Sequence, residues 1–354
     1  MPAGNRGLEP HEGRELINAA RLGERDAFEQ LVAPFRRELH IHCYRMTGSL
    51  SDTDDMLQDT LLKAWRRLDT FEPRSTFRAW LYKIATNTCL NELASRRRPR
   101  FLAREQWSGG PPVLADVPYL EPYPDRLLDE IDDPAERLVR KENIAIAFIA
   151  AIQLLPPRQR AVLILRDVLD WSAKEVADGL EASVASVNSA LQRARSTLRT
   201  RARDDPSGGG AVVPADHAER KLLNRFIEAW DRADFEGLAA LLKEDALLAM
   251  PPRPEWFRGR DAIIDFLSRV PADGRIDIIR LVEVRANRQP ATAAYIADPE
   301  GDGYQFYGMM VFSIESDSIS VITGFPNAHI GEPFGLPSWI PAGARDKGSS
   351  VGGV

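Results

Sequence analysis

"LPPRQRAVLILRDVLDWSAKEVADGLEASVASVNSALQRARSTLRTRAR", residues 155–203, is the most informative stretch of the chain. Its last part, Ser183 to Arg203, contains five arginines and no acidic residue, although the whole chain of 354 residues has a formal net charge of −6. Apolar residues recur there at three- and four-residue steps, which predicts an amphipathic helix with one buried face. The apolar stripe consists of Val184, Val187, Leu191, Ala194 and Leu198. The opposite faces of this helix present arginine and amide side chains.

The helices before this basic segment have well-marked starts. Pro156 and Pro157 suit a first helical turn, Ser172 and Glu175 form a capping-box pattern, and Ser183 can cap the last helix. A short capped helix, a tight turn and a basic helix are the layout of a helix-turn-helix, whose second helix enters the major groove of DNA. Asn and Gln can bind adenine edges there, and Arg can bind guanine. The candidate base contacts are Asn188, Ser189, Gln192 and Arg193. The alternative is a surface helix whose basic face is merely solvated.

Charge is segregated along the chain on the amino-terminal side of this block. Residues 74–104 hold eight Lys or Arg against one acid, whereas residues 105–136 hold nine acids against one Arg, together with six prolines. The acidic, proline-rich composition predicts an extended linker. A linker of this sign cannot itself bind DNA, because like charges repel. Two basic segments therefore flank one acidic tether.

Periodicity divides the chain into three folded units. Apolar spacing is helical from Arg14 to about residue 98 and again from Pro134 to Arg203. After a glycine-rich break, helices are expected near 217–231, 235–243 and 261–269, before strand-like runs at 303–314 and 318–325. This order predicts an α+β domain with helices on an antiparallel sheet. The predicted segments are a helical bundle at 14–104, an acidic linker at 105–133, a helix-turn-helix block at 134–203, a glycine-rich linker at 204–216, an α+β domain at 217–335 and a flexible tail at 336–354.

Two motif sets in a fixed order resemble one family. The helix-turn-helix stretch, residues 155–203, is similar to the promoter −35 recognition domain of bacterial RNA polymerase sigma factors of the extracytoplasmic-function group. Upstream, "DTDDMLQDTLLKAWRRLDTF" and "STFRAWLYKIATNTCLNELASRRR" resemble that group's core-polymerase-binding and −10-recognition helices. The likeness covers roughly residues 14–203. It implies two all-α sigma domains, joined to the α+β domain in a multi-domain protein.

The resemblance also assigns roles to individual residues. The residues that it places on the polymerase clamp are Asp55, Gln58, Asp59, Leu62 and Trp65. The alternative is a helix that packs within its own bundle, with Leu61, Leu62 and Trp65 in the core. The resemblance also implies that a base of the −10 element flips into a pocket. The residues placed around this element are Phe71, Arg74, Ser75, Thr76, Lys83, Asn87, Arg96 and Arg97. For Trp80 the alternatives are burial in the bundle and contact with DNA. Arg96, Arg97 and Arg98 suit phosphate contacts, and the alternative is a solvated charge cluster.

The resemblance also bears on the linker and on the turn before the basic helix. The resemblance implies that the acidic linker threads the polymerase channel later used by RNA, and a disordered spacer is the alternative. The family commonly has Gly just before the recognition helix, whereas here Leu180 precedes Glu181 and Gly179 lies one place early. This departure predicts a shifted or distorted turn. Asn188 stands where a basic residue is frequent, so the −35 preference cannot be transferred.

Residues 217–335 resemble the SnoaL-like domains of the cone fold found in nuclear transport factors. The segments "FIEAWDRADFEGLAALLKEDALLAMPP" and "WFRGRDAIIDFL" carry this likeness. Such cones can enclose a pocket, and the candidate lining residues, which could equally be core, are Trp230, Met250, Trp256, Phe257, Phe266, Tyr295, Tyr307 and Phe325. Asp245 and His329 are the only candidates for a catalytic base. Since neither lies in a diagnostic motif, a regulatory domain is the more economical interpretation.

Several other classes of site are disfavoured. No phosphate-binding glycine loop, nucleophile elbow or zinc-protease motif occurs, so neither a cofactor nor a metal is expected. In "HIHC", His42 lies about 200° from His40 on a helix, which leaves only His40 and Cys43 to share a ligand. The longest apolar run, Ile144 to Ile152, is too short to span a bilayer, and the first residues do not resemble a secretory signal. A cytoplasmic protein with Cys43 and Cys89 as buried reduced thiols is expected.

The sequence therefore predicts a non-catalytic sigma factor. It would bind core RNA polymerase and promoter DNA, and its SnoaL-like domain would regulate it in place of, or beside, a separate anti-sigma factor. One alternative is a helix-turn-helix repressor that acts without polymerase. Another is a bifunctional protein whose SnoaL-like domain binds or converts a small molecule.

Overall fold

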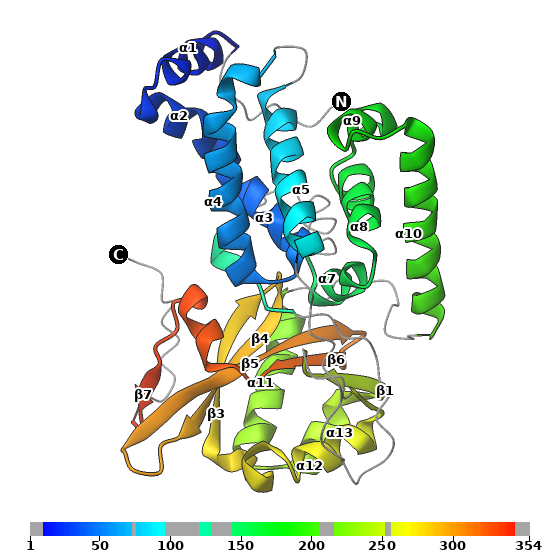
Figure 1. The fold of residues 1–354 in the computed structure, drawn as a ribbon. Helices are drawn as coiled ribbons and strands as arrows, with labels where there is room; N and C mark the ends of the chain where they lie inside the picture. Colours follow the sequence, from blue (N-terminus) through cyan, green and yellow to red (C-terminus); the bar gives the residue numbers. More distant parts are fainter. Residues whose placement is uncertain are drawn as a thin grey trace. The chain divides into compact units, whose positions relative to one another are not determined.

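The computed structural model describes residues 10–72, 76–95, 120–128, 144–204, 216–251 and 256–343. These residues belong to two compact units (Figure 1). One unit draws on residues 1–100 and 149–201, and the other on residues 101–148 and 202–354. No helix among the described residues is long and apolar enough to cross a membrane.

The first unit begins with a helical bundle. Its elements are α1 (Pro10–Arg21), α2 (Arg25–Val32), η1 (Ala33–Phe35), α3 (Arg36–Thr47), α4 (Leu50–Arg66), η2 (Leu68–Thr70) and α5 (Phe77–Ser95). The last three α-helices pack on one another (Figure 1), and Leu39, Met46 and Leu81 are buried in the bundle. Cys43 and Cys89 are buried free thiols, as expected. The helical bundle that the periodicity predicts is therefore present.

A second helical block completes this unit. It contains α7 (Ile146–Gln153), α8 (Pro157–Leu163), the π-helical turn η4 (Ile164–Val168), α9 (Ala173–Gly179) and α10 (Val184–Asp204). The predicted helix starts are confirmed: α8 begins at Pro157, and Ser172 and Glu175 form a complete capping box at α9. Ser183 Oγ accepts a hydrogen bond from the Ser186 N–H at 3.1 Å. Local capping chemistry thus sets the helix boundaries of the helix-turn-helix.

The second unit contains a mixed sheet with helices on one face (Figure 1). Its helices are α11 (Asp216–Asp231), α12 (Phe235–Leu241) and α13 (Arg260–Leu267), with short turns η3 (Asp125–Leu127), η6 (Pro271–Gly274), η7 (Ile276–Ile278) and η8 (Ala328–Phe334). Its strands are β1 (Leu242–Ala249), β2 (Trp256–Arg258), β3 (Ile279–Ala286), β4 (Gln289–Ala297), β5 (Gly303–Glu315), β6 (Ser318–Phe325) and β7 (Trp339–Pro341). The strand order is β2-β1-β6-β5-β4-β3, and β7 pairs with β5.

The core of the second unit lies between these helices and the sheet. Phe226 and Trp230 of α11 pack near Phe312 of β5, and Leu238 and Ile263 join the same buried cluster. The α+β class is confirmed, but the expectation of a fully antiparallel sheet is wrong, because β1 pairs parallel with β6. A parallel pair needs a long crossover connection, and the chain between these two strands supplies it. The helix expected at 235–243 ends at Leu241, where β1 begins.

Candidate nucleic-acid interface

The basic helix α10 has one buried face and one exposed face. Val187, Leu191 and Ala194 are buried. The expectation for the first stripe residue is wrong, because Val184 lies in the first turn of the helix and is 44% exposed. The four predicted base contacts, which all lie on the exposed side, are Asn188, Ser189, Gln192 and Arg193. The helix therefore presents amide and guanidinium groups outward from an anchored apolar face.

An ion pair fixes α10 on its own block. The Arg195 guanidinium donates to both carboxylate oxygens of Asp167, at 2.9 and 2.6 Å. The hydrogen bonds to Asp167 stabilise the charged guanidinium and therefore raise the pKa of Arg195. A bidentate pair also fixes orientation. Arg195 is thus occupied within the protein, whereas Arg193 on the same helix is exposed.

The turn before α10 contains a residue in a left-handed conformation. Glu181 adopts a left-handed backbone with φ 51°, where a glycine would fit without strain. Gly179 is the last residue of α9, and the Ala182 N–H closes the turn by donating to the Ala177 carbonyl at 2.9 Å. The sequence predicts a shifted or distorted turn. Glu181 occupies a left-handed position in this turn, at a conformational cost of about 1 kcal/mol or more.

Arg160 is a buried side chain that the sequence did not single out. It is 3% exposed, and its guanidinium donates to the carbonyls of Ile152 at 2.9 Å and Gln153 at 2.7 Å. It also donates to the Met46 carbonyl at the end of α3. The signal in the sequence was the arginine in "LPPRQR", three residues after the proline that begins α8. Backbone carbonyls that end one helix need such donors.

The amino-terminal end of α5 shows how the predicted −10 residues are arranged. Thr76 Oγ1 accepts a hydrogen bond from the Ala79 N–H at 3.1 Å, so Thr76 caps the helix. The expectation that Phe71 surrounds a base needs correction, because its ring is 7% exposed. It packs on Phe77 and Trp80, with ring centroids 5.4 and 5.5 Å apart. Burial of its apolar surface makes Phe71 a support for this loop.

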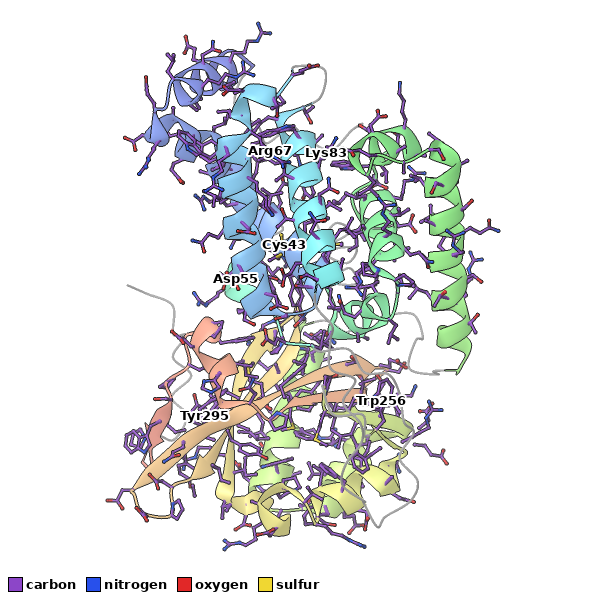
Figure 2. The ribbon with its side chains drawn as sticks, viewed as in Figure 1. Cys43, Asp55, Arg67, Lys83, Trp256 and Tyr295 are labelled. Carbon is purple, nitrogen blue, oxygen red and sulfur yellow. The ribbon has the colours of Figure 1, made fainter. Side chains whose placement is uncertain are left out.

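Lys83 lies further along α5 (Figure 2). Asn87 follows it on the same helix, and both side chains are partly exposed. The Lys83 ammonium lies 3.4 Å from the Glu181 carboxylate and 3.5 Å from the Asp178 carbonyl. The other predicted −10 residues, which lie outside the described residues, are Arg74, Ser75, Arg96 and Arg97. The structure thus locates four of the predicted −10 side chains on or beside α5, one of them buried.

The predicted polymerase-binding face of α4 is exposed. Asp55 points outward from α4 (Figure 2). Gln58 and Asp59 are also exposed, and Leu62 exposes 44% of its surface. Trp65 differs from them because its ring packs on Phe28, with centroids 5.1 Å apart. The alternative of a helix buried in its own bundle applies to Leu61, which is 8% exposed. The other positions form an acidic surface with one apolar residue.

The two histidines of α3 are held by hydrogen bonds. His40 Nε2 lies 2.9 Å from Asp54, and His42 Nε2 lies 2.9 Å from Thr86 Oγ1. Burial lowers the pKa of His42 to about 3, with smaller effects from Arg45 and Arg78. Within the described ranges, no three His, Cys, Asp or Glu side chains are grouped so as to hold a metal ion.

Most candidate pocket residues of the α+β unit pack in its interior. Trp230, Phe257 and Phe266 belong to the buried cluster, and the Trp230 indole donates to the Ile279 carbonyl at 2.9 Å. Met250 is partly buried against the same cluster. Tyr295 contacts Phe306, with ring centroids 5.4 Å apart, whereas Tyr307 is 39% exposed. Phe325 is buried and Trp256 half-buried. These aromatic residues serve chiefly as core.

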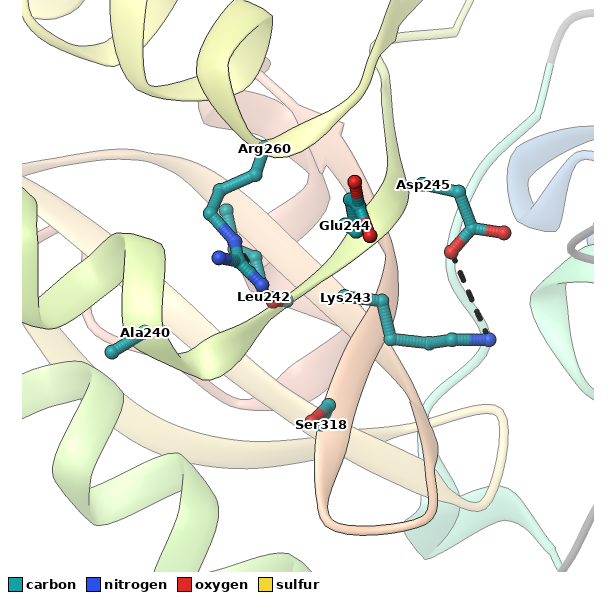
Figure 3. Close-up of a pocket in the computed structure, with 7 residues that line it drawn as sticks. All are labelled: Ala240, Leu242, Lys243, Glu244, Asp245, Arg260 and Ser318. Atoms are coloured by element: carbon teal, nitrogen blue, oxygen red, sulfur yellow. Dashed lines mark hydrogen bonds and ion pairs between the residues drawn. The ribbon is translucent and has the colours of Figure 1, made fainter.

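The two candidate catalytic bases lie near the surface. Asp245 lines a surface hollow on β1, together with Lys243 and Arg260 (Figure 3). Its carboxylate lies 3.8 Å from the Lys243 ammonium, which also contacts Glu315 at 2.8 Å. The Arg260 guanidinium donates to the Leu242 carbonyl at 2.9 Å. His329 is exposed in η8. A catalytic base on this scaffold was expected to be buried, whereas Asp245 and His329 are both exposed.

The turn between β3 and β4 binds a segment of the acidic linker. Asn287, which is buried with φ 56°, accepts a hydrogen bond at its side chain from the Tyr123 N–H and donates from its amide to the Ile144 carbonyl. Both distances are 2.8 Å. Its own backbone N–H donates to the Tyr123 carbonyl at 2.8 Å, and Pro124 forms a β-bridge with Ala286. This segment, Leu120–Leu128, is a docked peptide where the sequence predicts an extended linker.

Asp125 provides the charged contact of the docked segment. Its carboxylate accepts from the Arg288 backbone N–H at 2.6 Å and lies 3.3 Å from the Arg285 guanidinium. Burial raises the pKa of this carboxyl, although both contacts act in the opposite direction. Arg126 donates to the Pro333 carbonyl at 2.9 Å. A visible signal was the apolar content of "YLEPYPD", where Leu120 and Tyr123 are unusual for a solvated spacer.

Comparisons with known proteins agree with these elements in order along the chain. Residues 31–99 match the Sigma-70 region 2 family, residues 145–198 the Sigma-70, region 4 family, and residues 223–322 the SnoaL-like domain family. The ECF RNA polymerase sigma factor SigG of Mycobacterium tuberculosis is 40% identical over 342 residues, which cover 95% of this chain and 88% of that protein. The ECF RNA polymerase sigma factor SigW of Bacillus subtilis is 26% identical over 54% of this chain and 97% of its own length.

A solved structure shows the same fold. The extracytoplasmic function sigma factor SigJ of Mycobacterium tuberculosis matches 86% of this chain and 97% of its own, with a TM-score of 0.57 and 20% identity. Two helical DNA-binding blocks followed by a SnoaL-like domain define a class of fused transcription initiation factors. The chain belongs to the family of ECF RNA polymerase sigma factors. The sequence-based recognition of this family is thereby confirmed.

Proposed function

We propose that this protein binds core RNA polymerase through the exposed acidic face of α4 and directs initiation at promoters. In this proposal α10 contacts the −35 element with Asn188, Ser189, Gln192 and Arg193. The observation that carries it is the exposure of all four side chains on a helix whose opposite face is buried. Base edges in the major groove are reached by side chains displayed in this way.

The −10 element would be contacted from the amino-terminal half of α5. Thr76 directly precedes α5, and Lys83 and Asn87 are partly exposed further along this helix, with Phe71 as a buried support. Arg74, Ser75, Arg96 and Arg97 remain predicted contacts of the same element. In this proposal the protein acts in the cytoplasm, because core polymerase and promoter DNA are found there.

The direct test is transcription in vitro with purified core polymerase on a genomic fragment library. Starts that appear only when the full-length protein is added, and that share −35 and −10 elements, are expected. A conventional repressor would instead bind DNA tightly without polymerase and direct no start. That second result, together with no association with polymerase, would overturn the proposal.

The SnoaL-like domain, in this proposal, restrains initiation by holding the linker. Two hydrogen bonds of 2.8 Å join Asn287 to the backbone of Tyr123 in the linker, and Asp125 is bound by the same turn. A segment held in this way cannot at the same time follow the polymerase channel. Release of Leu120–Leu128 would therefore accompany assembly with polymerase. A non-catalytic role fits the surface positions of Asp245 and His329.

Hydrogen exchange measures this restraint in the full-length protein. The Tyr123 N–H is donated to Asn287, so its exchange is expected to be slow in the free protein and faster in the polymerase complex. The amides around Ile279, whose carbonyl accepts a hydrogen bond from the Trp230 indole in the core of the same domain, serve as a reference. They should stay protected in both states. Unchanged protection at Tyr123 in an active complex would contradict the restraint.

A further inference from the structure

The carboxyl-terminal end of α1 is anchored on the helical bundle. The helix packs against α2 and η2, and Ala20 near its end is buried. Gly23 follows the helix with φ 96°, a left-handed conformation that favours glycine, and its N–H donates to the Ala20 carbonyl at 3.0 Å. Arg21 is the last residue of α1. Its side chain therefore extends from a backbone position that packing and hydrogen bonds hold in place.

The Arg21 guanidinium links α1 to the turn η2. Its Nη2 donates to the Phe71 carbonyl at 2.6 Å and to the Leu68 carbonyl at 3.4 Å, and its Nε donates to the Leu68 carbonyl at 3.4 Å. The Phe71 N–H donates to the same Leu68 carbonyl at 3.1 Å and closes the turn. Hydrogen bonds from a charged guanidinium are stronger than those between neutral groups. Arg21 thus holds the backbone on both sides of η2, where the chain continues toward α5.

The ring of Phe71 carries this contact to the first turn of α5. It packs on Phe77 and Trp80, with ring centroids 5.4 and 5.5 Å apart, and these two rings stack on each other at 5.5 Å. Close-packed side chains transmit displacements, so a shift of the Phe71 backbone would move this cluster. Thr76, an exposed residue predicted to contact the −10 element, caps the same end of α5. The position of Thr76 therefore depends on how Phe71 is held.

A phosphate contact is the alternative role for Arg21, because the residue is exposed on the bundle. The two roles need different chemistry. A lysine can replace an arginine at a phosphate, since it supplies a point charge there. It cannot reproduce the planar fork with which Nε and Nη2 reach the Leu68 and Phe71 carbonyls together. The lysine substitution at this position therefore separates a positioning role from direct contact with DNA.

We propose that Arg21 is a positioning residue for recognition of the −10 element. It lies outside the set of residues that the family resemblance places around this element, and in this proposal it does not touch DNA. It holds Phe71, whose ring supports the start of α5 and the predicted contact Thr76. The inference rests on the proposed sigma function and deepens it, because it names the group that orients the −10 contacts.

Run-off transcription with the full-length protein and core polymerase tests the positioning role. The readout is the ratio of transcript from an intact promoter to transcript from a derivative with a substituted −10 element, beside the same ratio for a substituted −35 element. A variant that merely folds less well lowers all transcripts alike and leaves both ratios unchanged. Arg21→Met is expected to reduce the −10 ratio by about fivefold or more, an effect of the size of one lost base contact. Its −35 ratio should equal that of the wild type.

Arg14→Met is the matched control, because Arg14 is an exposed arginine on the same helix. Both of its ratios should equal those of the wild type. Arg21→Lys should lose −10 discrimination as Arg21→Met does, and it decides the outcome alone if Arg21→Met yields too little transcript to measure. A −10 ratio that Arg21→Lys retains would indicate a phosphate contact and overturn the proposal.

Two further outcomes separate this inference from the function on which it rests. An unchanged −10 ratio in Arg21→Met, or equal falls in its −10 and −35 ratios, would overturn the positioning role while the sigma function stands. Absence of any promoter-directed start with the wild-type protein would instead reject the sigma function itself.

Discussion

At the scale of single residues, His42 shows how burial governs the response to pH. The ring is fully buried, hydrogen-bonded to Thr86 and stacked edge-on against Tyr82. Because burial lowers its pKa to about 3, the folded protein keeps the neutral ring where an unfolded chain would bind a proton. Protonation of the unfolded state below its pKa of about 6.5 then favours unfolding.

The first prediction follows from this difference. When the pH is lowered from 6.5 to 5, the unfolding free energy of the wild type should fall by roughly 2 kcal/mol because of His42. The His42→Gln variant should not show this fall. The loss sets in as the pH falls through about 6.5, the unfolded pKa, and continues until the pH falls through the folded pKa of about 3. Urea unfolding at both pH values measures it, with His40→Gln as the control on the same helix. Equal pH dependence of wild type and His42→Gln would contradict this effect of burial.

Arg160 carries the second prediction at this scale. Replacing it by Met leaves several buried carbonyls without a donor, each worth about 1 kcal/mol or more. Arg160→Met should therefore lower the unfolding free energy of the first unit by about 3 kcal/mol. Arg158→Met is the control, because Arg158 is exposed on the same helix. Urea unfolding that gives the two variants similar midpoints would show that the buried network contributes little.

Residue identity alone did not settle the roles of these side chains. Glu181 departs from the family's glycine, and its identity alone did not show that it occupies a left-handed position at a modest conformational cost. Phe71 looked like a base contact, but its ring is buried beside Phe77 and Trp80. The outcome at Glu181 depends on backbone conformation, and the outcome at Phe71 depends on how its ring packs against its neighbours. Motif spacing does not report either.

At the scale of elements, capped helices were the most predictable part of the fold. Ser172, Glu175 and Ser183 act locally, so the boundaries of α9 and α10 could be predicted from a few adjacent residues. Strand β4 was not predicted. It is alanine-rich, contains Pro290 and is buried on both faces over most of its length, so it lacks the alternation that identifies a strand.

The recognition helix supports the third prediction. Asn188→Ala and Gln192→Ala should each reduce −35-dependent initiation by about tenfold or more, because one good base contact is worth about 1–3 kcal/mol. Ser196→Ala, an exposed substitution on the same helix, should leave initiation unchanged. Run-off transcription from a promoter found in the library screen measures all three. Equal activity of Asn188→Ala, Gln192→Ala and Ser196→Ala would show that α10 does not read the −35 element.

At the scale of the whole molecule, the order of segments was predictable and the linker contact was not. Composition and periodicity indicated two helical blocks, an acidic tether and an α+β domain. The contact between Tyr123 and Asn287 joins residues 164 positions apart. It depends on a turn between two strands, and local composition cannot specify such a pairing. The apolar residues within the acidic segment were its only trace in the sequence.

The fourth prediction concerns this contact. Asn287→Gly keeps a residue that tolerates positive φ but removes the side chain that binds the linker. It should increase promoter-directed transcription, because the linker is then free to enter the polymerase. Asp317→Gly is the matched control, since Asp317 also has positive φ in an exposed hairpin turn of the same sheet.

Run-off transcription with purified core polymerase decides whether the protein initiates at promoters under restraint by its SnoaL-like domain. The full-length wild type, Asn287→Gly and Asp317→Gly are compared at equal concentrations on one promoter. We expect specific transcripts from all three proteins, with a severalfold higher yield from Asn287→Gly alone. Equal yields from the three would contradict restraint by the SnoaL-like domain, and absence of specific transcripts from all of them would contradict the sigma function.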